Sequence, residues 1–113
     1  MSNHFHVSST RSGDQATISC SGELDIAAAP DVERVVDELF SDKPPSIELD
    51  WSRLTFMDST GIRLLLMIVK RCGVDGIDLV WRLSDSAQRA LDAVGIHDGL
   101  LRQLEHDATR EAE

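Results

Sequence analysis

The sequence contains few cysteines, few prolines and few aromatic residues. Its 113 residues include no tyrosine, two tryptophans, three phenylalanines, three prolines and two cysteines. So few cysteines exclude a disulfide framework, and Cys20 and Cys72 lie too far apart for a CxxC metal or redox motif. Both cysteines fall in segments with apolar patterning. The sequence therefore predicts reduced, partly buried thiols.

Positive charge and long apolar runs are also scarce. Eleven lysines and arginines stand against twenty aspartates and glutamates, which gives a net charge of −9. This balance argues against direct binding of nucleic acid, which needs a basic surface. The longest apolar run, residues 64–69, is too short to cross a bilayer, and residues 1–6 lack the basic and apolar regions of a signal peptide. We therefore expect a cytoplasmic protein that does not associate with membranes.

Apolar residues make up 42% of the chain, enough for one small core. Apolar and polar residues alternate in segments 5–8 and 15–24, and residues 11–14 between them have turn composition, which predicts a β-hairpin. A helix with Pro30 in its first turn is expected next, because valines and a leucine recur at helical spacing up to Leu39. Two prolines at positions 44 and 45 mark its end.

The second half of the chain alternates strands and helices. Residues 46–51 and 76–83 have strand composition, residues 59–72 form an apolar helical run stopped by Gly73, and a further helix runs from Ser84 to Gly95. Single helices between strands imply right-handed parallel crossovers. We expect one α/β domain over residues 1–104, with a mixed, mostly parallel sheet of four to five strands that begins with the antiparallel hairpin. Residues 105–113 are charged and poor in apolar residues, and we expect this acidic tail to fray.

The most informative segment is residues 54–62, Leu-Thr-Phe-Met-Asp-Ser-Thr-Gly-Ile. Asp58 stands directly before a long apolar helical pattern, where a carboxylate can accept hydrogen bonds from the free N–H groups of a helix start. Ser59 and Thr60 follow it, so two hydroxyl groups lie where a kinase can reach them. A helix N-terminus also tolerates an added phosphate, because it carries partial positive charge.

This segment closely resembles the signature of the STAS-domain anti-sigma factor antagonists, and the resemblance extends over about residues 7–104. It implies a STAS fold and a role in partner switching. The unphosphorylated form would bind an anti-sigma factor that is also a serine kinase, and a sigma factor would thereby be released. The kinase would phosphorylate Ser59 and dissociate, and a phosphatase would reset the system.

The resemblance also implies which residues meet the partner. Ser59 corresponds to the phosphorylated serine, and Asp58 helps to position it besides capping the helix. Asp25, at the end of the segment Gly-Glu-Leu-Asp, matches a strand-end motif that contributes to the partner surface, although capping the turn before the first helix explains it equally well. Thr60 is a weaker phosphorylation candidate whose alternative role is first-turn geometry. Gly61 is expected to permit close approach of a neighbouring element or partner.

A helical wheel assigns further candidates on the predicted helix 59–72. Ile62, Leu65, Leu66, Val69 and Cys72 share the face expected to lie against the sheet. Thr60, Arg63, Met67, Lys70 and Arg71 share the outer face, with Leu64 at its edge. Arg63, Leu64 and Met67 are therefore candidate partner contacts, since apolar residues rimmed by charge can mark a docking surface. Arg63 also departs from the family, which often has glycine there, and it can influence which kinase binds.

Other functions have weaker support in the sequence. A nucleophilic triad of Ser59, Asp58 and a histidine lacks the expected motif, so no catalytic residue is assigned. No metal site is assigned, because His4 and His6 lack a third ligand nearby, and no cofactor is expected because no nucleotide-binding motif is present. The main alternative is a STAS-fold scaffold or interaction module outside sigma-factor control.

Overall fold

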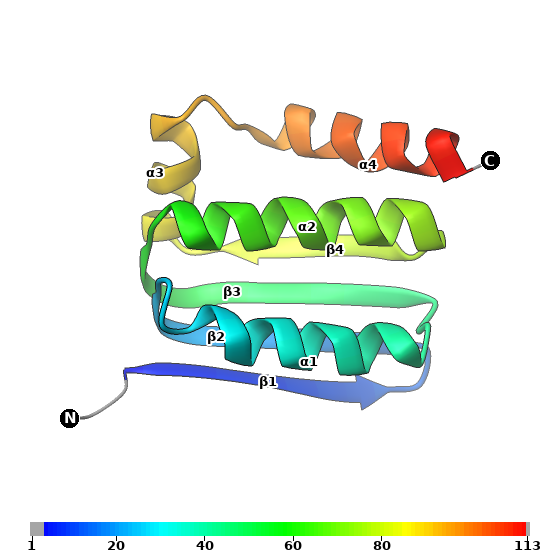
Figure 1. Ribbon diagram of the computed structural model, residues 1–113, viewed down its shortest axis with the longest axis horizontal. Helices are drawn as coiled ribbons and strands as arrows, with labels where there is room; N and C mark the ends of the chain where they lie inside the picture. The colour runs from blue at the N-terminus through cyan, green and yellow to red at the C-terminus, as the bar shows by residue number, and fades with distance from the viewer. Residues whose placement is uncertain (1–3, 113) are drawn as a thin grey trace.

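The computed structural model describes residues 4–112, which form a four-stranded sheet and four helices (Figure 1). Strands β1 (Phe5–Ser12) and β2 (Gln15–Leu24) pair in antiparallel register, with Ser12 opposite Gln15 across the turn. Gly13 in this turn has a φ of 59°, a conformation that glycine adopts without steric cost. The predicted hairpin is confirmed.

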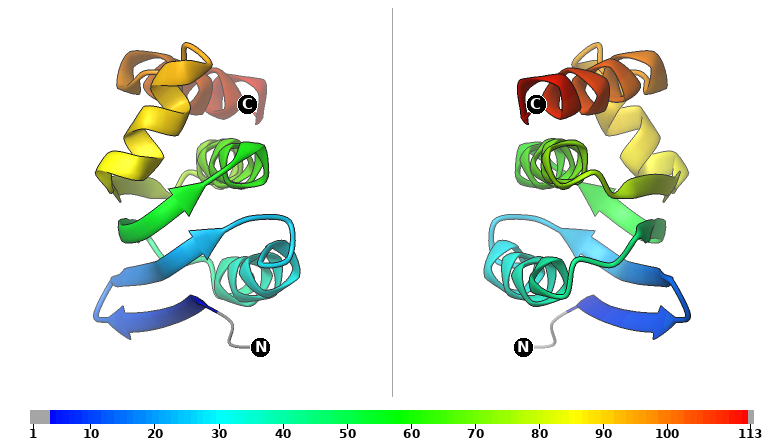
Figure 2. Two further views of the ribbon diagram at one scale, coloured as in Figure 1. Left: turned by 90° about the vertical axis from the view of Figure 1, so that its left-hand side faces the viewer. Right: turned by 90° about the vertical axis from the view of Figure 1, so that its right-hand side faces the viewer.

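The remaining strands are parallel. Strands β3 (Ser46–Met57) and β4 (Asp78–Leu83) complete the sheet in the order β1-β2-β3-β4. Helices α1 (Ala29–Ser41) and α2 (Ser59–Asp75) connect β2 to β3 and β3 to β4, and both cover the same face of the sheet (Figure 2). Two right-handed crossovers that step in the same direction have this result. The predicted mixed sheet of an α/β domain is therefore confirmed, with four strands among the described residues.

The core lies between this sheet face and the two crossover helices. Alternate residues of β2 and β3 point toward the helices and are fully buried, whereas their sequence neighbours on the other face are polar. The buried residues of the two strands include Ala16, Ile18, Cys20, Ile47, Leu49 and Trp51. This alternation is typical of a sheet that buries one face. Both cysteines are buried free thiols, and burial raises the pKa of each to about 12, so they are unreactive at neutral pH.

Strand β3 is longer than its sequence suggested. A strand over 46–51 followed by a loop was expected, but β3 continues to Met57 and leaves only Asp58 between strand and helix. Leu54 pairs with Gly22 and Met57 with Leu24 of β2, across two register shifts in the ladder. The buried residues Trp51, Leu54 and Met57 are therefore three positions apart instead of two. This part of the strand does not show the alternation of apolar and polar residues that predicts a strand.

Helix α2 also extends beyond its expected end. Gly73 does not stop it. The helix ends at Asp75, and Gly76, with a φ of 69°, provides the left-handed cap. Gly73 is instead a buried position inside the helix. A Cβ atom there would overlap the carbonyl oxygen of Glu105, so this glycine permits another helix to pack closely.

That other helix is α4 (Asp98–Ala112), which follows α3 (Asp85–Ala93) and packs along α2 (Figure 1). Ser84 caps α3 as predicted, since its hydroxyl accepts a hydrogen bond from the Ala87 N–H. The expectation that residues 105–113 fray is wrong for residues 105–112, which are helical. Ala108 is buried, and the Thr109 hydroxyl donates to the Gly73 carbonyl over 2.9 Å.

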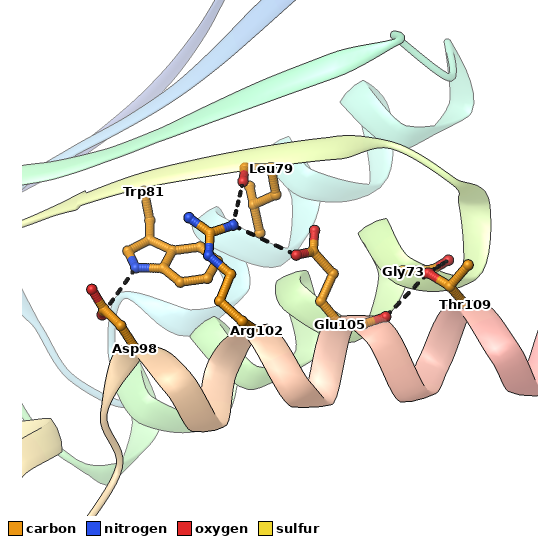
Figure 3. A network of polar contacts seen from close by, with 7 residues as sticks. All are labelled: Gly73, Leu79, Trp81, Asp98, Arg102, Glu105 and Thr109. Atoms are coloured by element: carbon orange, nitrogen blue, oxygen red, sulfur yellow. Dashed lines mark hydrogen bonds and ion pairs between the residues drawn. The ribbon is translucent and has the colours of Figure 1, made fainter.

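Side chains of α4 also attach it to β4, as Figure 3 shows. The Arg102 guanidinium lies 3.9 Å from the centre of the Trp81 ring and donates to the Leu79 carbonyl over 3.1 Å. The Trp81 indole N–H donates to Asp98 at the start of α4. These contacts cover part of the outer edge of β4, which would otherwise leave strand backbone groups exposed. Helix α4 is thus an integral part of the fold.

Candidate functional site

The residues of the signature segment lie where two neighbouring parallel strands end. Leu24 and Met57 are the last residues of β2 and β3 and are paired with each other. Asp25 and Asp58 follow them directly, and the Asp58 N–H donates to the Leu24 carbonyl over 3.3 Å. The structure therefore brings together two carboxylates that are 33 positions apart in the sequence. Figure 1 shows that the N-terminus of α2 and the β2–α1 loop share this end of the molecule.

Asp58 caps α2 as expected. Its backbone is extended, with φ −107° and ψ −164°, and its side chain accepts a hydrogen bond of 2.8 Å from the Thr60 N–H. Its carbonyl accepts the first helical hydrogen bond, from Ile62. The carboxylate satisfies one of the free N–H groups at the helix start and fixes the direction in which the first turn leaves the sheet.

The two hydroxyl groups of the first turn differ in access. Ser59 is the first residue of α2 and is exposed, whereas Thr60 is half-buried. A protein kinase must bring the acceptor oxygen in line with the terminal phosphate of ATP, so the acceptor has to project from the surface. Of the two hydroxyl groups, that of the exposed Ser59 meets this access requirement better than that of the half-buried Thr60.

Asp25 orders the loop that lies beside this turn. Its side chain accepts a hydrogen bond of 3.0 Å from the Ala27 N–H, and its carbonyl accepts one from Ala28. Asp25 therefore does perform the turn-capping role that was its alternative assignment. The same turn leaves Ile26 with 78% of its surface exposed.

Gly61 is buried in the first turn of α2. A Cβ atom at this position would overlap the side chain of Met57 and touch that of Leu24. The close approach predicted for Gly61 is thus an approach by residues of the same chain. It lets the helix start lie directly on the ends of β2 and β3.

Arg63 projects from α2 toward α1. Its guanidinium lies 4.0 Å from the Glu33 carboxylate, and both side chains are partly exposed. Arg63 therefore lies at the surface beside Ser59, as the helical wheel predicted.

The wheel placed Leu64 incorrectly. Leu64 is fully buried and belongs to the core, so it cannot contact a partner. Met67 is half-buried and packs against the same core, and Ile62 and Leu66, expected on the sheet side, are also half-buried. The physical reason is that α2 contacts α1 and α4 as well as the sheet, which buries a wider arc than a helix lying on one sheet face.

Two exposed apolar residues beside the site were missed by the sequence reasoning. They are Ile26, in the turn after β2, and Phe56, which is 47% exposed and lies two residues before Asp58. The signal for Ile26 was available, because an isoleucine in the turn before a helix has no place in the apolar periodicity. Phe56 could not be separated from its buried neighbour Met57 without knowledge of the register shifts.

Neither a metal-binding cluster nor a membrane-spanning helix occurs among the residues that the structure describes. Among residues 4–112 there is no group of three or more histidine, cysteine, aspartate or glutamate side chains arranged to hold a metal ion. No helix within these residues is long and apolar enough to span a membrane. The His97 side chain accepts a hydrogen bond from the Leu100 N–H at the start of α4.

Comparison with known protein families decides the identity of the fold. The family model described as "STAS domain" matches residues 6–108, which include the strands, the crossover helices and most of α4. This chain belongs to the STAS domain family. The match passes beyond residue 104, in agreement with the helical structure of residues 105–108.

Two relatives of this STAS domain are named as anti-sigma factor antagonists. It is 29% identical over 58 residues to the anti-sigma-F factor antagonist RsfB of Mycobacterium tuberculosis, a match that covers 51% of this chain and 48% of RsfB. The match thus spans about half the length of that relative. It is 24% identical over 96 residues to the anti-sigma-B factor antagonist of Staphylococcus aureus, covering 84% of this chain and 89% of that protein.

Solved structures show the same fold. An anti-sigma factor antagonist from Mycobacterium paratuberculosis superposes with a TM-score of 0.69 at 24% identity, covering 80% of this chain and 78% of that one. The anti-sigma factor antagonist SpoIIAA in its unphosphorylated form superposes with a TM-score of 0.64 at 21% identity, covering 87% and 83%. At these identities the superpositions establish the STAS fold.

Proposed function

We propose that this STAS domain is an anti-sigma factor antagonist controlled by phosphorylation of Ser59. In the unmodified state it binds an anti-sigma factor that is also a serine kinase, and this binding releases a sigma factor. The kinase transfers the terminal phosphoryl group of ATP to the Ser59 hydroxyl, ADP is left, and the modified domain dissociates. A phosphatase removes the phosphate and restores the binding form. The protein thus acts by binding and is not an enzyme.

The observation that carries this proposal is the placement of Ser59. It is the exposed first residue of α2, at the edge of the sheet where Asp25 and Asp58 follow two adjacent strand ends. The names of the relatives support the same role, because both belong to anti-sigma factor antagonists. A kinase that binds this edge would find one projecting hydroxyl on a rigid helix start.

The partner surface we propose is centred on this edge. It comprises Ser59 and Thr60, the flanking carboxylates of Asp25 and Asp58, and Arg63 on the next turn. Ile26 adds exposed apolar area of the kind that is buried when a partner binds. Gly61 contributes indirectly by holding the helix start against Met57, and Met67 contributes only its accessible part.

Phosphorylation would act on the complex more than on the fold. A phosphate adds about −1.5 to −2 charges and three acceptor oxygens. The free N–H groups of the helix start tolerate that charge, so the domain stays folded. In a packed interface, however, the phosphate needs space and must be desolvated, beside two carboxylates that already make this edge acidic. A loss of about 3 kcal/mol corresponds to roughly a hundredfold weaker binding, enough for a switch.

Phosphosite mapping with a cognate anti-sigma kinase tests the proposal. After incubation with kinase and ATP, the intact mass of the wild-type domain should rise by one phosphate, about 80 Da, and peptide mapping should assign it to Ser59. Thr60→Ala should accept the phosphate, whereas Ser59→Ala should not. Ser59 is exposed, so Ser59→Ala should remain folded.

Two results would contradict the phosphorylation proposal. One is a phosphate that still appears on the Ser59→Ala variant. The other is a stable complex with the kinase that leaves Ser59 unmodified in the presence of ATP, which would instead support a scaffold or interaction role outside sigma-factor control.

A further inference from the structure

Arg63 lies one helical turn beyond Ser59, on the same side of α2. Residues four apart on a helix are about 40° apart around the axis, with Cβ atoms about 5–6 Å from each other. An anion that precedes a cation by four residues is the favourable order for such a pair, because it also agrees with the helix dipole. A phosphate on Ser59 would therefore be within reach of the long Arg63 side chain.

The present partner of Arg63 holds it only weakly. The closest approach between its guanidinium and the Glu33 carboxylate is 4.0 Å, and the two side chains are 58% and 43% exposed. Ion pairs with this exposure and separation contribute little to stability, since water and salt screen them. The pair therefore leaves the Arg63 guanidinium free to move to a stronger anion nearby.

We infer that Arg63 exchanges partners when Ser59 is phosphorylated: its guanidinium leaves Glu33 on α1 and pairs with the phosphate on its own helix. This inference rests on the proposed phosphorylation of Ser59. A phosphate carries more charge than the Glu33 carboxylate and presents oxygens that a guanidinium can bind in pairs. Three carboxylates lie around the position, Asp25 and Asp58 at the strand ends and Glu33 on α1. A nearby cation would offset part of the negative charge that the phosphate adds beside them.

The exchange gives phosphorylation a second effect on the proposed partner surface. In the unmodified domain, Arg63 is an exposed cation next to Ser59 and can meet an acidic group of the partner. In the modified domain the phosphate occupies it. One modification would thus add negative charge at Ser59 and withdraw a positive charge from the adjacent turn.

A titration of the phosphate tests the exchange without any kinase. Phosphoserine is incorporated at position 59 during synthesis, and the second pKa of the phosphate, ordinarily about 6, is followed by ³¹P NMR at an ionic strength of about 0.1 M, where the screening length is about 10 Å. A guanidinium beside the phosphate favours the dianion and lowers this pKa. In Arg63→Gln it should rise by about 0.3 unit relative to the phosphorylated wild type.

Lys70→Gln provides the matched control. It removes one positive charge from the exposed surface of the same helix, but eleven residues beyond Ser59, or about 16 Å along the axis. At that separation screening suppresses its influence, and the phosphate pKa should equal that of the wild type. Equal pKa values in Arg63→Gln and Lys70→Gln would overturn the inference. Failure of the proposed function would give a different result. The kinase would then not phosphorylate Ser59, but the difference in phosphate pKa between Arg63→Gln and Lys70→Gln would remain.

Discussion

Each end of α2 contains one buried glycine, but the two glycines pack against different parts of the molecule. At the N-terminal end, Gly61 lies against the flexible side chain of Met57, and Ser59, two residues earlier, stays exposed. At the C-terminal end, Gly73 lies against the backbone of α4, where a Cβ atom would overlap the Glu105 carbonyl oxygen. The first end stays open at the surface, and the second is closed by another helix.

Under the proposed function, this difference separates the residues that act in binding from those that stabilise the fold along one helix. At the open end, the Asp25 and Asp58 carboxylates cap local turns and Ser59 is exposed. At the closed end, polar groups join two helices, as in the hydrogen bond from Thr109 to the Gly73 carbonyl. A change at the closed end should therefore affect stability first. A change at the open end should affect partner binding and phosphorylation first.

The largest predicted effect on stability is at Gly73. In Gly73→Ala the new methyl group meets backbone atoms that cannot rotate away, so α4 must shift along α2. We expect a loss of about 2 kcal/mol in the free energy of unfolding, measured by urea denaturation. Gly61→Ala is the matched variant in the same helix. Its methyl group meets Met57, which can change rotamer, and the gain in helix propensity offsets part of the cost.

The comparison fails if Gly61→Ala destabilises the domain as much as Gly73→Ala. That result would mean that the open end is packed as rigidly as the closed one. Circular dichroism of both variants should show an unchanged strand content, because neither glycine belongs to the sheet.

The second prediction concerns the helix cap of the open end. Asp58→Ala removes the acceptor for the Thr60 N–H and should cost about 1 kcal/mol of stability. Ser84→Ala is a matched control, because Ser84 caps α3 in the same way through Ala87 and should cost a similar amount. Only Asp58→Ala should also slow phosphorylation of Ser59 by the kinase, since only this cap positions the acceptor. Equal phosphorylation rates in the two variants would remove Asp58 from the site.

The smallest effect is a pH dependence at the closed end. Burial raises the pKa of the Glu105 carboxyl above its ordinary 4.5, nearby Asp78 adds to this, and the ion pair with Arg102 opposes it. A raised folded-state pKa contributes stability that is complete below pH 4.5 and is lost as pH rises through the folded value. Glu105→Gln lacks this titration. Its melting temperature relative to the wild type should therefore be higher at pH 7 than at pH 4, and a difference that does not change with pH would contradict the assignment.

Much of the architecture could be predicted from local patterns. The hairpin, the crossover helices and the caps at Asp58 and Ser84 follow from alternation, helical spacing and the preference of short polar residues for helix starts. The site could be predicted in part. Asp58, Ser59 and Gly61 stand in one segment, but only the pairing of Leu24 with Met57 brings Asp25 to the same edge.

The errors have a common physical origin in tertiary packing. A glycine is typical of a helix end, but Gly73 lies inside α2. A residue without a side chain is needed there because α4 packs directly against it. Leu64 was assigned to an outer face because a wheel divides a helix into two sides, whereas α2 is covered from several directions. The end of α4 lacks the large apolar residues of a buried helix, because its inner surface consists of small residues such as Ala108. None of these features produces a periodic apolar signal.

The most direct test of the account compares the affinity of two forms of the domain for the cognate anti-sigma kinase, one with unmodified Ser59 and one with phosphoserine incorporated there. Isothermal titration calorimetry with a non-hydrolysable ATP analogue keeps the unmodified form intact during the measurement. The account predicts binding that is about a hundredfold weaker for the phosphorylated form, with both forms equally stable toward urea. Equal affinities of the two forms would contradict it.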